Sequence, residues 1–218
     1  ILARDGMTPE KLDAILARGV PMLVDEAYAE LRFDRALPLD VRSAAPERTY
    51  LVGGISKSVC PGLRIGWIVA PAGARELLLE NKRLGDLQAG TLVQALFMHW
   101  LSHHDYDAHV RRAVRLYRAR AHALQRPLAE LLPTWSIARP QGGFCVVADT
   151  GVVADEVSML RAAREEGVVY DPGSGFRARP DPRDTLLLRL CYSNLDTQRI
   201  AEGVRRLGRA YRRCITRS

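Results

Sequence analysis

The sequence of 218 residues lacks both a long hydrophobic run and a leader-like N-terminus. No stretch reaches the roughly eighteen consecutive apolar residues that suggest a membrane-spanning helix. The opening segment, ILARDGMTPE, does not have the basic-then-apolar layout of a signal peptide. We therefore expect a cytoplasmic protein with no membrane partner.

Cysteine is scarce and is not spaced for a metal centre. The four cysteines, Cys60, Cys145, Cys191 and Cys214, form no C-x-x-C pair. Neither a zinc ribbon nor a redox dithiol is therefore indicated. We expect these residues to be ordinary small packing residues.

Four of the histidines lie in one helical region, at His99, His103, His104 and His109. His99 and His103 are one helical turn apart, but no convincing third and fourth ligand accompanies them. We expect no metal site and interpret the group as helix-end residues near a domain junction.

Lysine is scarce too, so the positive charge of the chain is almost entirely arginine. The 32 Lys and Arg against 25 Asp and Glu give a net charge of +7, which would normally favour nucleic acid because clustered cations release counterions from phosphates. Here the arginines are interleaved with acidic residues along amphipathic helices. The richest tract, RRLGRAYRRCITRS, is typical of a solvated helix end and tail. We expect nucleic acid not to be a partner.

The first half of the chain alternates helix and strand patterns. With 47% hydrophobic residues, the chain can bury a sizeable core as one large domain or two small ones. A helical pattern from Thr8, a capping residue, to Gly19 is followed by strand patterns at 21–28, 49–56 and 64–71. These segments are short and nearly all apolar, as in sheets covered on both faces.

After Pro71 the period becomes helical, and the longest helix is expected from about 105 to 132. Pro127 should kink this helix, which would reach roughly 40 Å and is long enough to link two domains. Strands around PQGG, a helix, a strand at DTLLLRLCYS and a closing helix follow. We therefore expect an α/β domain, 1–104, joined to a long linking helix and a small α+β domain, 105–218.

Lys57 lies just past the expected strand 49–56, where a lysine flanked by small residues has no obvious packing role. It is preceded by Ser56 and followed by PGLRIGW, in which Gly62 and Gly66 bracket Arg64. A lysine in this setting is a candidate for forming an imine. A surface lysine after a strand is an equally good interpretation of this segment alone.

Two other charged residues occupy apolar strands. Asp25 ends the first strand pattern, where open α/β sheets place ligands, although a lone aspartate is usually a helix or turn cap. Arg189 stands in the middle of LLLRLCYS. Its guanidinium suits a carboxylate held by two hydrogen bonds, and a structural ion pair with a neighbouring Asp or Glu is the alternative.

Taken in order, VDEAYAEL, GGISKSVCPGLRIGWIVAP, PQGGF and LRLCYSN resemble the C-terminal half of the fold-type-I, class I/II aminotransferases, which use pyridoxal 5′-phosphate. The spacing from Lys57 to Arg64 is closest to the branch of aromatic, kynurenine and 2-aminoadipate aminotransferases and of aminotransferase-like domains of bacterial regulators. The similarity covers most of the chain. It implies part of the large-domain sheet with helices on both faces, which binds the cofactor, followed by the α+β small domain.

The resemblance also implies roles for individual residues. Lys57 would form the internal aldimine with pyridoxal 5′-phosphate and later shuttle a proton. Asp25 would pair with the pyridine nitrogen, and Tyr28 would hydrogen-bond the ring hydroxyl oxygen. Ser56 and Arg64 would hold the phosphate.

By the same resemblance, Arg189 would bind the substrate α-carboxylate, and the activity would be transamination between an α-amino acid and a 2-oxo acid in a homodimer. Three alternatives stay open: a non-catalytic sensor module that binds the cofactor in a regulator, a cofactor-free, inactive remnant, and a lyase or decarboxylating synthase of the same fold, since the same imine chemistry serves several reactions. Relatives carry a substantial region before the point that matches Ile1. Without its strands, exposed edges and apolar surface should follow, which favours pairing with another chain or poor solubility.

Overall fold

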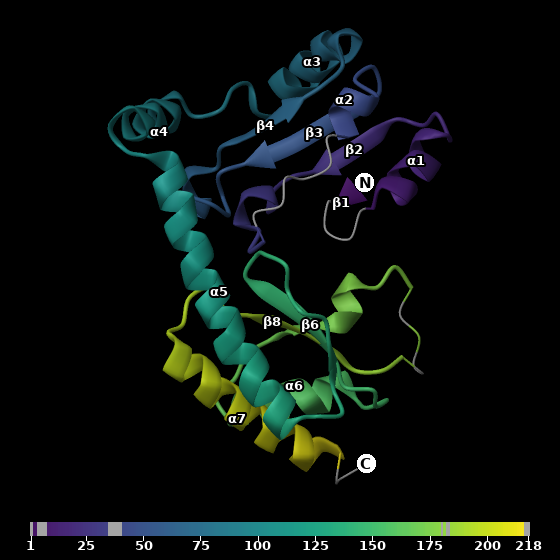
Figure 1. Ribbon diagram of the computed structural model, residues 1–218, viewed down its shortest axis with the longest axis vertical. Helices are drawn as coiled ribbons and strands as arrows, with labels where there is room; N and C mark the ends of the chain where they lie inside the picture. Colours follow the sequence, from purple (N-terminus) through teal and green to yellow (C-terminus); the bar gives the residue numbers. More distant parts are fainter. Residues whose placement is uncertain (1, 4–7, 35–40, 180, 182–183, 216–218) are drawn as a thin grey trace. The chain divides into compact units, whose positions relative to one another are not determined.

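The chain forms two compact units, which the computed structural model describes at residues 2–3, 8–34, 41–179, 181 and 184–215. Unit 1 is Ile1–Val114 and unit 2 is Arg115–Ser218. The division falls inside the long helix α5 (Tyr106–Leu131), whereas the sequence reading set a boundary before that helix. Each unit has its own four-stranded sheet (Figure 1).

The sheet of unit 1 has the order β1-β2-β3-β4. Its strands are β1 (Leu2–Ala3), β2 (Met22–Asp25), β3 (Thr49–Gly54) and β4 (Gly66–Val69). The first three run parallel, and β4 is antiparallel to β3. The 3₁₀ turns in this unit are η1 (Ala29–Leu31), η2 (Pro61–Leu63) and η3 (Ala72–Ala74).

Helices α1 (Pro9–Leu16) and α2 (Val41–Ala44) build the core of unit 1 with β2 and β3. As predicted, Thr8 caps α1, its hydroxyl accepting the Lys11 amide at 3.4 Å, and Gly19 follows the helix with φ +66°. The buried residues of the core are Leu12, Met22, Val24, Val41 and Ala45.

The strand β4 and the helices α3 (Arg75–Asp86) and α4 (Thr91–His103) carry an apolar surface that the described chain does not cover. Neither helix buries a residue. The large apolar side chains exposed here are Trp67, Ile68, Leu77, Leu79, Leu84, Leu87, Leu92, Leu96 and Met98. The exposed apolar surface expected from the sequence is confirmed, and the apolar strand β4 is not covered on both faces.

Unit 2 is an antiparallel sheet of order β5-β6-β8-β7. The strands are β5 (Ser136–Ile137), β6 (Cys145–Asp149), β7 (Asp171–Pro172) and β8 (Leu187–Cys191). The other elements are α6 (Glu156–Glu165), the 3₁₀ turn η4 (Gly173–Phe176) and α7 (Thr197–Ile215). The α/β unit followed by an α+β unit, predicted from the pattern, is confirmed.

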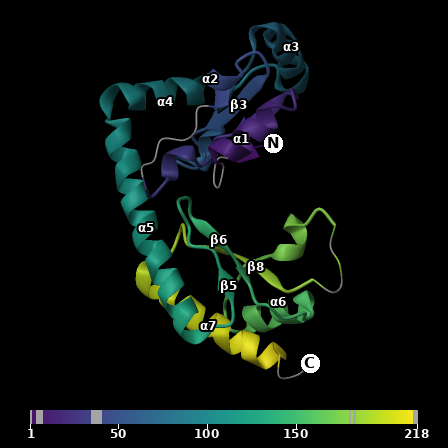
Figure 2. The same ribbon diagram turned by 45° about the vertical axis from the view of Figure 1, so that its right-hand side comes forward.

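One face of this second sheet is buried and the other is open. The residues on the buried face are Val146, Ala148, Leu188 and Leu190. Helices α5, α6 and α7, which also bury apolar residues, lie beside this sheet (Figure 2). On the other face Val147 is 51% exposed. Because side chains alternate along a strand, every second residue of β6 and β8 lies on this open face.

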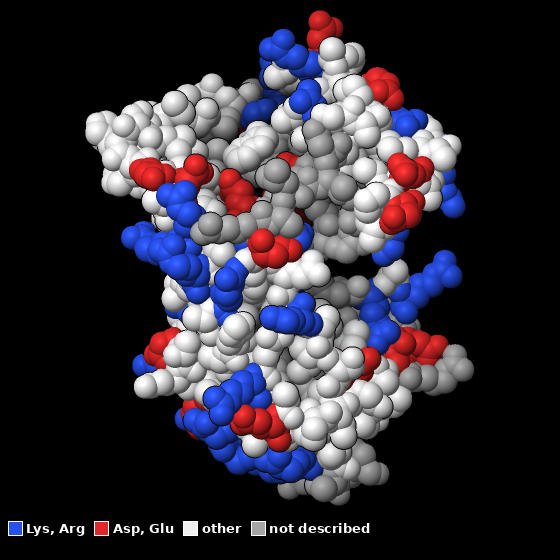
Figure 3. Space-filling model, viewed as in Figure 1, with Lys and Arg blue, Asp and Glu red and all other residues white. Residues whose placement is uncertain are grey.

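The C-terminal arginines are paired within unit 2. Arg209 and Arg213 reach Glu166 at 2.9 and 3.4 Å, and Arg205 and Arg206 both reach Glu202. On the face shown in Figure 3, basic and acidic side chains lie among one another. Among the described residues, no helix is long and apolar enough to cross a membrane.

Candidate functional site

The residues predicted to bind a cofactor lie at the carboxyl edge of the parallel strands β2 and β3. Asp25 is the last residue of β2 and is opposite Val52 of β3. The chain leaves β3 at Gly54 and continues directly into Ser56 and Lys57. This edge is where open α/β sheets bind ligands.

A short hydrogen-bonded turn holds Lys57. Ile55 is buried, and its carbonyl accepts the amides of Val59 at 2.9 Å and Cys60 at 3.1 Å. Lys57 is half-buried on this turn, and its Nζ lies 5.8 Å from the centroid of the Tyr28 ring. The two side chains are therefore within cation–π range.

The two glycines that precede the turn are required by the packing of β3 on β4. A Cβ at Gly53 would lie 2.6 Å from the Trp67 ring, and one at Gly54 would lie 3.0 Å from the Ile65 carbonyl oxygen. The motif GGISK thus contains a strand-pairing requirement as well as a lysine.

Asp25 and Arg64 each have a local structural role. The Asp25 Oδ1 accepts the amide of Ala27 at 2.9 Å, so this carboxylate does cap a turn, and Oδ2 remains for another partner. Arg64 is exposed, has φ 51° and donates to the Pro61 carbonyl at 3.4 Å. Left-handed backbone is uncommon for arginine and is a form of strain that clusters at ligand sites.

A network of polar side chains next to the Lys57 turn was not predicted from the sequence. Ser58 is buried, and its hydroxyl lies 3.1 Å from the hydroxyl of Tyr106, which donates to Glu30 Oε2 at 2.5 Å. Burial, and then the hydrogen bond to Glu30, raises the pKa of Tyr106 to about 12. His109 lies 2.9 Å from the Ser58 carbonyl through Nε2, which therefore carries the proton.

This network ties the turn to η1 and to the start of α5. Its partners are separated by 48 to 76 positions in the sequence. The feature of the sequence that could have pointed to this network was the position of Ser58 next to Lys57.

The remaining histidines make local contacts. His103 Nδ1 lies 2.7 Å from the His99 carbonyl, and His104 Nδ1 lies 3.0 Å from the Trp100 carbonyl. Within the part of the chain that the structure describes, no group of three or more His, Cys, Asp or Glu side chains is arranged to hold a metal ion.

Arg189 lies on the open face of the unit 2 sheet, opposite Asp171 of β7. Its Nη1 donates to Asp171 Oδ2 at 2.5 Å and to Cys191 Sγ at 3.2 Å. Partial burial acts to lower the pKa of the guanidinium, but the hydrogen bond to Asp171 and the charge interactions with Cys145, Cys191 and Asp171 together outweigh it and raise the pKa. The structural ion pair is therefore present, and the side chain is also on a face that a ligand can reach.

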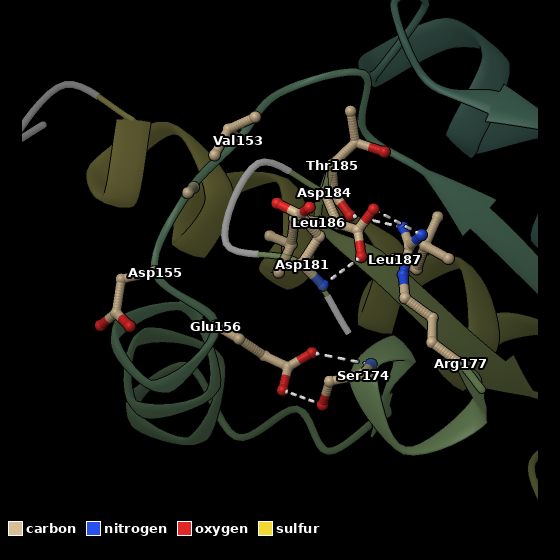
Figure 4. A pocket seen from close by; sticks show the side chains of 11 residues that line it. Val153, Asp155, Glu156, Ser174, Arg177, Asp181, Asp184, Thr185, Leu186 and Leu187 are labelled. Atoms are coloured by element: carbon tan, nitrogen blue, oxygen red, sulfur yellow. Dashed lines mark hydrogen bonds and ion pairs between the residues drawn. The ribbon is translucent and has the colours of Figure 1, made fainter. Parts of the chain in front are cut away.

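Unit 2 also contains an open pocket of about 550 Å³ beside η4 (Figure 4). Two pairs of its lining residues interact with each other. The Ser174 hydroxyl donates a hydrogen bond to Glu156 at 2.5 Å, and Arg177 forms an ion pair with Asp184 at 2.9 Å. These charged and polar groups therefore hold each other, Ser174 of η4 with Glu156 of α6 and Arg177 with Asp184.

Comparison with known protein families identifies the fold in which Lys57 follows the carboxyl end of β3. Residues 5–207 match the family model described as aminotransferase class I and II. The chain belongs to this family. Among solved structures, this chain is similar to LysN, an α-aminoadipate aminotransferase from Thermus thermophilus complexed with N-(5′-phosphopyridoxyl)-L-leucine. The TM-score is 0.88 and the identity 32%, over 96% of this chain and 54% of that one.

The curated relatives of this chain include both an enzyme and a regulator. It is 35% identical to a 2-aminoadipate transaminase of Thermus thermophilus, over 94% of this chain and 53% of that protein. It is also 35% identical to the HTH-type transcriptional regulator TauR of Rhodobacter capsulatus, over 88% of this chain and 40% of that protein. The chain thus spans about half the length, or less, of the relatives that it matches.

Proposed function

We propose that this chain is the lysine-bearing part of a pyridoxal-phosphate-dependent aminotransferase that acts on an α-amino acid and a 2-oxo acid. The observation that carries the proposal is the placement of Lys57 beside Tyr28, at the same sheet edge as Asp25. An amine, a phenol and a carboxylate at the carboxyl ends of adjacent parallel strands are the groups that this chemistry requires.

The donor set fits pyridoxal phosphate. Among the described residues, one oxygen of the Asp25 carboxylate is left to accept a hydrogen bond from a protonated ring nitrogen. The Tyr28 hydroxyl would donate to the oxygen on the ring, and Ser56 and Arg64 would bind the phosphate, the arginine by charge-assisted hydrogen bonds. When bound, the cofactor supplies a ring that accepts the electron pair left on the substrate carbon.

Lys57 has two tasks in this proposal. Its amine attaches the cofactor to the chain and, once released, moves a proton at the substrate carbon as a general acid and base. The turn that holds Lys57 is fixed by the Ile55 carbonyl and by the network of Ser58. These contacts hold the backbone turn from which the Lys57 side chain extends.

Arg189 is proposed for the α-carboxylate of the substrate. Within the described parts of the chain, Asp171 and Cys191 use only its Nη1. Its other donors are left for a carboxylate, which a guanidinium can hold by two parallel hydrogen bonds. A homodimer and a cytoplasmic location remain part of the proposal.

The test is attachment of the cofactor. After incubation of the chain with pyridoxal phosphate and reduction with borohydride, mass spectrometry should find the label on the peptide of Lys57. Lys57→Ala should remove the label. Lys82→Ala, which changes a lysine paired with Asp86 on α3, should leave it. Labelling that survives in Lys57→Ala would refute the assignment.

A sensor module is the second candidate, because HTH-type regulators are among the relatives. An enzyme, given an amino acid, converts the bound cofactor to its amino form and releases a 2-oxo acid. A sensor binds the cofactor without that conversion. Absorbance of the bound cofactor and assay of the 2-oxo acid separate the two. If the chain bound no pyridoxal phosphate at all, the result would favour the alternative of a cofactor-free, inactive remnant.

A further inference from the structure

Two cysteines that are 46 positions apart in the sequence are direct neighbours in the sheet of unit 2. Cys145 begins β6 and Cys191 ends β8, and the antiparallel register places them opposite each other. Strand pairing therefore brings together two cysteines that the spacing in the sequence keeps apart.

The register permits a covalent bond between them. The amide of Tyr192 donates to the Phe144 carbonyl at 2.9 Å, and these two residues are the next opposite pair along the ladder. In an antiparallel ladder, hydrogen-bonded and non-hydrogen-bonded pairs alternate, so Cys145 and Cys191 form a non-hydrogen-bonded pair. The Cα atoms of such a pair are about 4.5 Å apart, within the range of about 4.4–6.8 Å that a disulfide spans.

Both thiols are on the open face of the sheet. Cys191 is exposed and Cys145 is half-buried, whereas the neighbouring Val146 and Leu190 point into the core. A small molecule can therefore reach Cys191 first, with Cys145 beside it. The two other cysteines differ: Cys60 is exposed in unit 1, and Cys214 is buried on α7.

A fixed cation lies next to the exposed thiol. Arg189 Nη1 is 3.2 Å from Cys191 Sγ and is anchored by Asp171. Burial raises the pKa of the Cys191 thiol, and the charge of Arg189 opposes that rise. Thiol exchange, which requires the thiolate, should therefore be faster in mildly alkaline buffer.

We propose that Cys145 and Cys191 are a redox-active dithiol that low-molecular-weight disulfides oxidise to a cross-strand disulfide. The Cys191 thiol loses its proton to solvent, and its sulfur attacks one sulfur of the small disulfide. A mixed disulfide forms and one small thiolate leaves. Cys145, after losing its own proton, attacks Cys191 Sγ and releases the second small thiolate. The two protein thiols are oxidised, the small disulfide is reduced to two thiols, and the two protons end on them.

The experiment uses the whole chain, reduced and then equilibrated with mixtures of oxidised and reduced glutathione. Free thiols are alkylated and the peptides mapped by mass spectrometry. We expect a linked peptide pair containing Cys145 and Cys191, and a loss from the chain of the mass of two hydrogen atoms. At a fixed concentration of reduced glutathione, the link should form at a concentration of oxidised glutathione roughly tenfold or more below that needed to modify Cys60, because the second thiol is already in place.

Variants define each step. Cys145→Ser should stop at glutathione attached to Cys191, Cys191→Ser should give no link, and Cys60→Ser should behave as the unchanged chain. The link in the unchanged chain is a readout that does not depend on the folding of any variant. In urea the preference for Cys145 with Cys191 should disappear.

Two outcomes would overturn the proposal. In the first, Cys60 takes up glutathione while Cys145 and Cys191 stay unlinked. In the second, the link joins two chains, or forms with equal preference in urea, so that the sheet register does not direct it.

Discussion

Removal of the Tyr106 hydroxyl should loosen the turn that carries Lys57. In Tyr106→Phe, the buried hydroxyl of Ser58 loses its partner at 3.1 Å, and the carboxylate of Glu30 loses its donor at 2.5 Å. The aromatic ring itself remains. The change therefore isolates the polar contacts that join the turn to α5 and η1.

The size of the effect follows from the two contacts. A hydrogen bond to a charged group contributes about 1.5–3 kcal/mol, and because Glu30 is exposed we take less than the lower end. A buried hydroxyl left without a partner costs about 1 kcal/mol. Together they predict that opening of residues 55–60 becomes easier by about 2 kcal/mol, or roughly 30-fold in the opening equilibrium.

Amide hydrogen exchange followed by mass spectrometry measures this equilibrium. The amides of Val59 and Cys60, which donate to the Ile55 carbonyl, should exchange roughly 30-fold faster in Tyr106→Phe. Tyr117→Phe is the matched control, since Tyr117 is on the same helix but packs against Phe144 in unit 2. Equal exchange of residues 55–60 in the two variants would show that the network does not hold the turn.

Three further predictions concern stability and association. Gly53→Ala places a Cβ 2.6 Å from the indole ring of Trp67 and should lower the free energy of unfolding of unit 1 by about 1–3 kcal/mol, measured in urea. Gly73→Ala is the control: its Cβ meets nothing within 4 Å, so the free energy of unfolding should change little. Because the folded pKa of Tyr106 is raised from 10.0 to about 12, the contribution of Tyr106 to stability should be complete below pH 10 and be lost between pH 10 and about 12, where the unfolded chain ionises first. Urea unfolding across that range should show a smaller loss in Tyr106→Phe, and an equal loss would assign the effect to other groups. Finally, the apolar surface of α4 should make the chain associate as its concentration rises, and Leu92→Lys with Leu96→Lys should reduce the average mass in sedimentation; an unchanged mass would exclude this surface.

The local sequence pattern was sufficient to predict most of the helices and strands. The cap at Thr8, the end at Gly19 and the apolar strands at β2 and β3 follow from side-chain preference and periodicity over a few residues, and the structure agrees with them. The family could also be recognised, because its motifs around Lys57 and Arg189 are short and contiguous.

Contacts between residues that are far apart in the sequence could not be predicted from the sequence. Ser58 meets Tyr106, and Tyr106 meets Glu30, only because β3, α5 and η1 converge. The same holds for Arg189, for which the sequence left a ligand and an ion pair as alternatives until the register placed Asp171 opposite.

The sequence by itself thus determined which residues have the chemistry: an amine after a strand, a carboxylate at a strand end, and an arginine within an apolar strand. Only the tertiary structure decided their neighbours. The physical reason is that secondary structure depends on contacts within a few positions, whereas the ion pair of Arg189 and the opposition of Cys145 and Cys191 depend on strand register, which is fixed when a whole face of the sheet is buried.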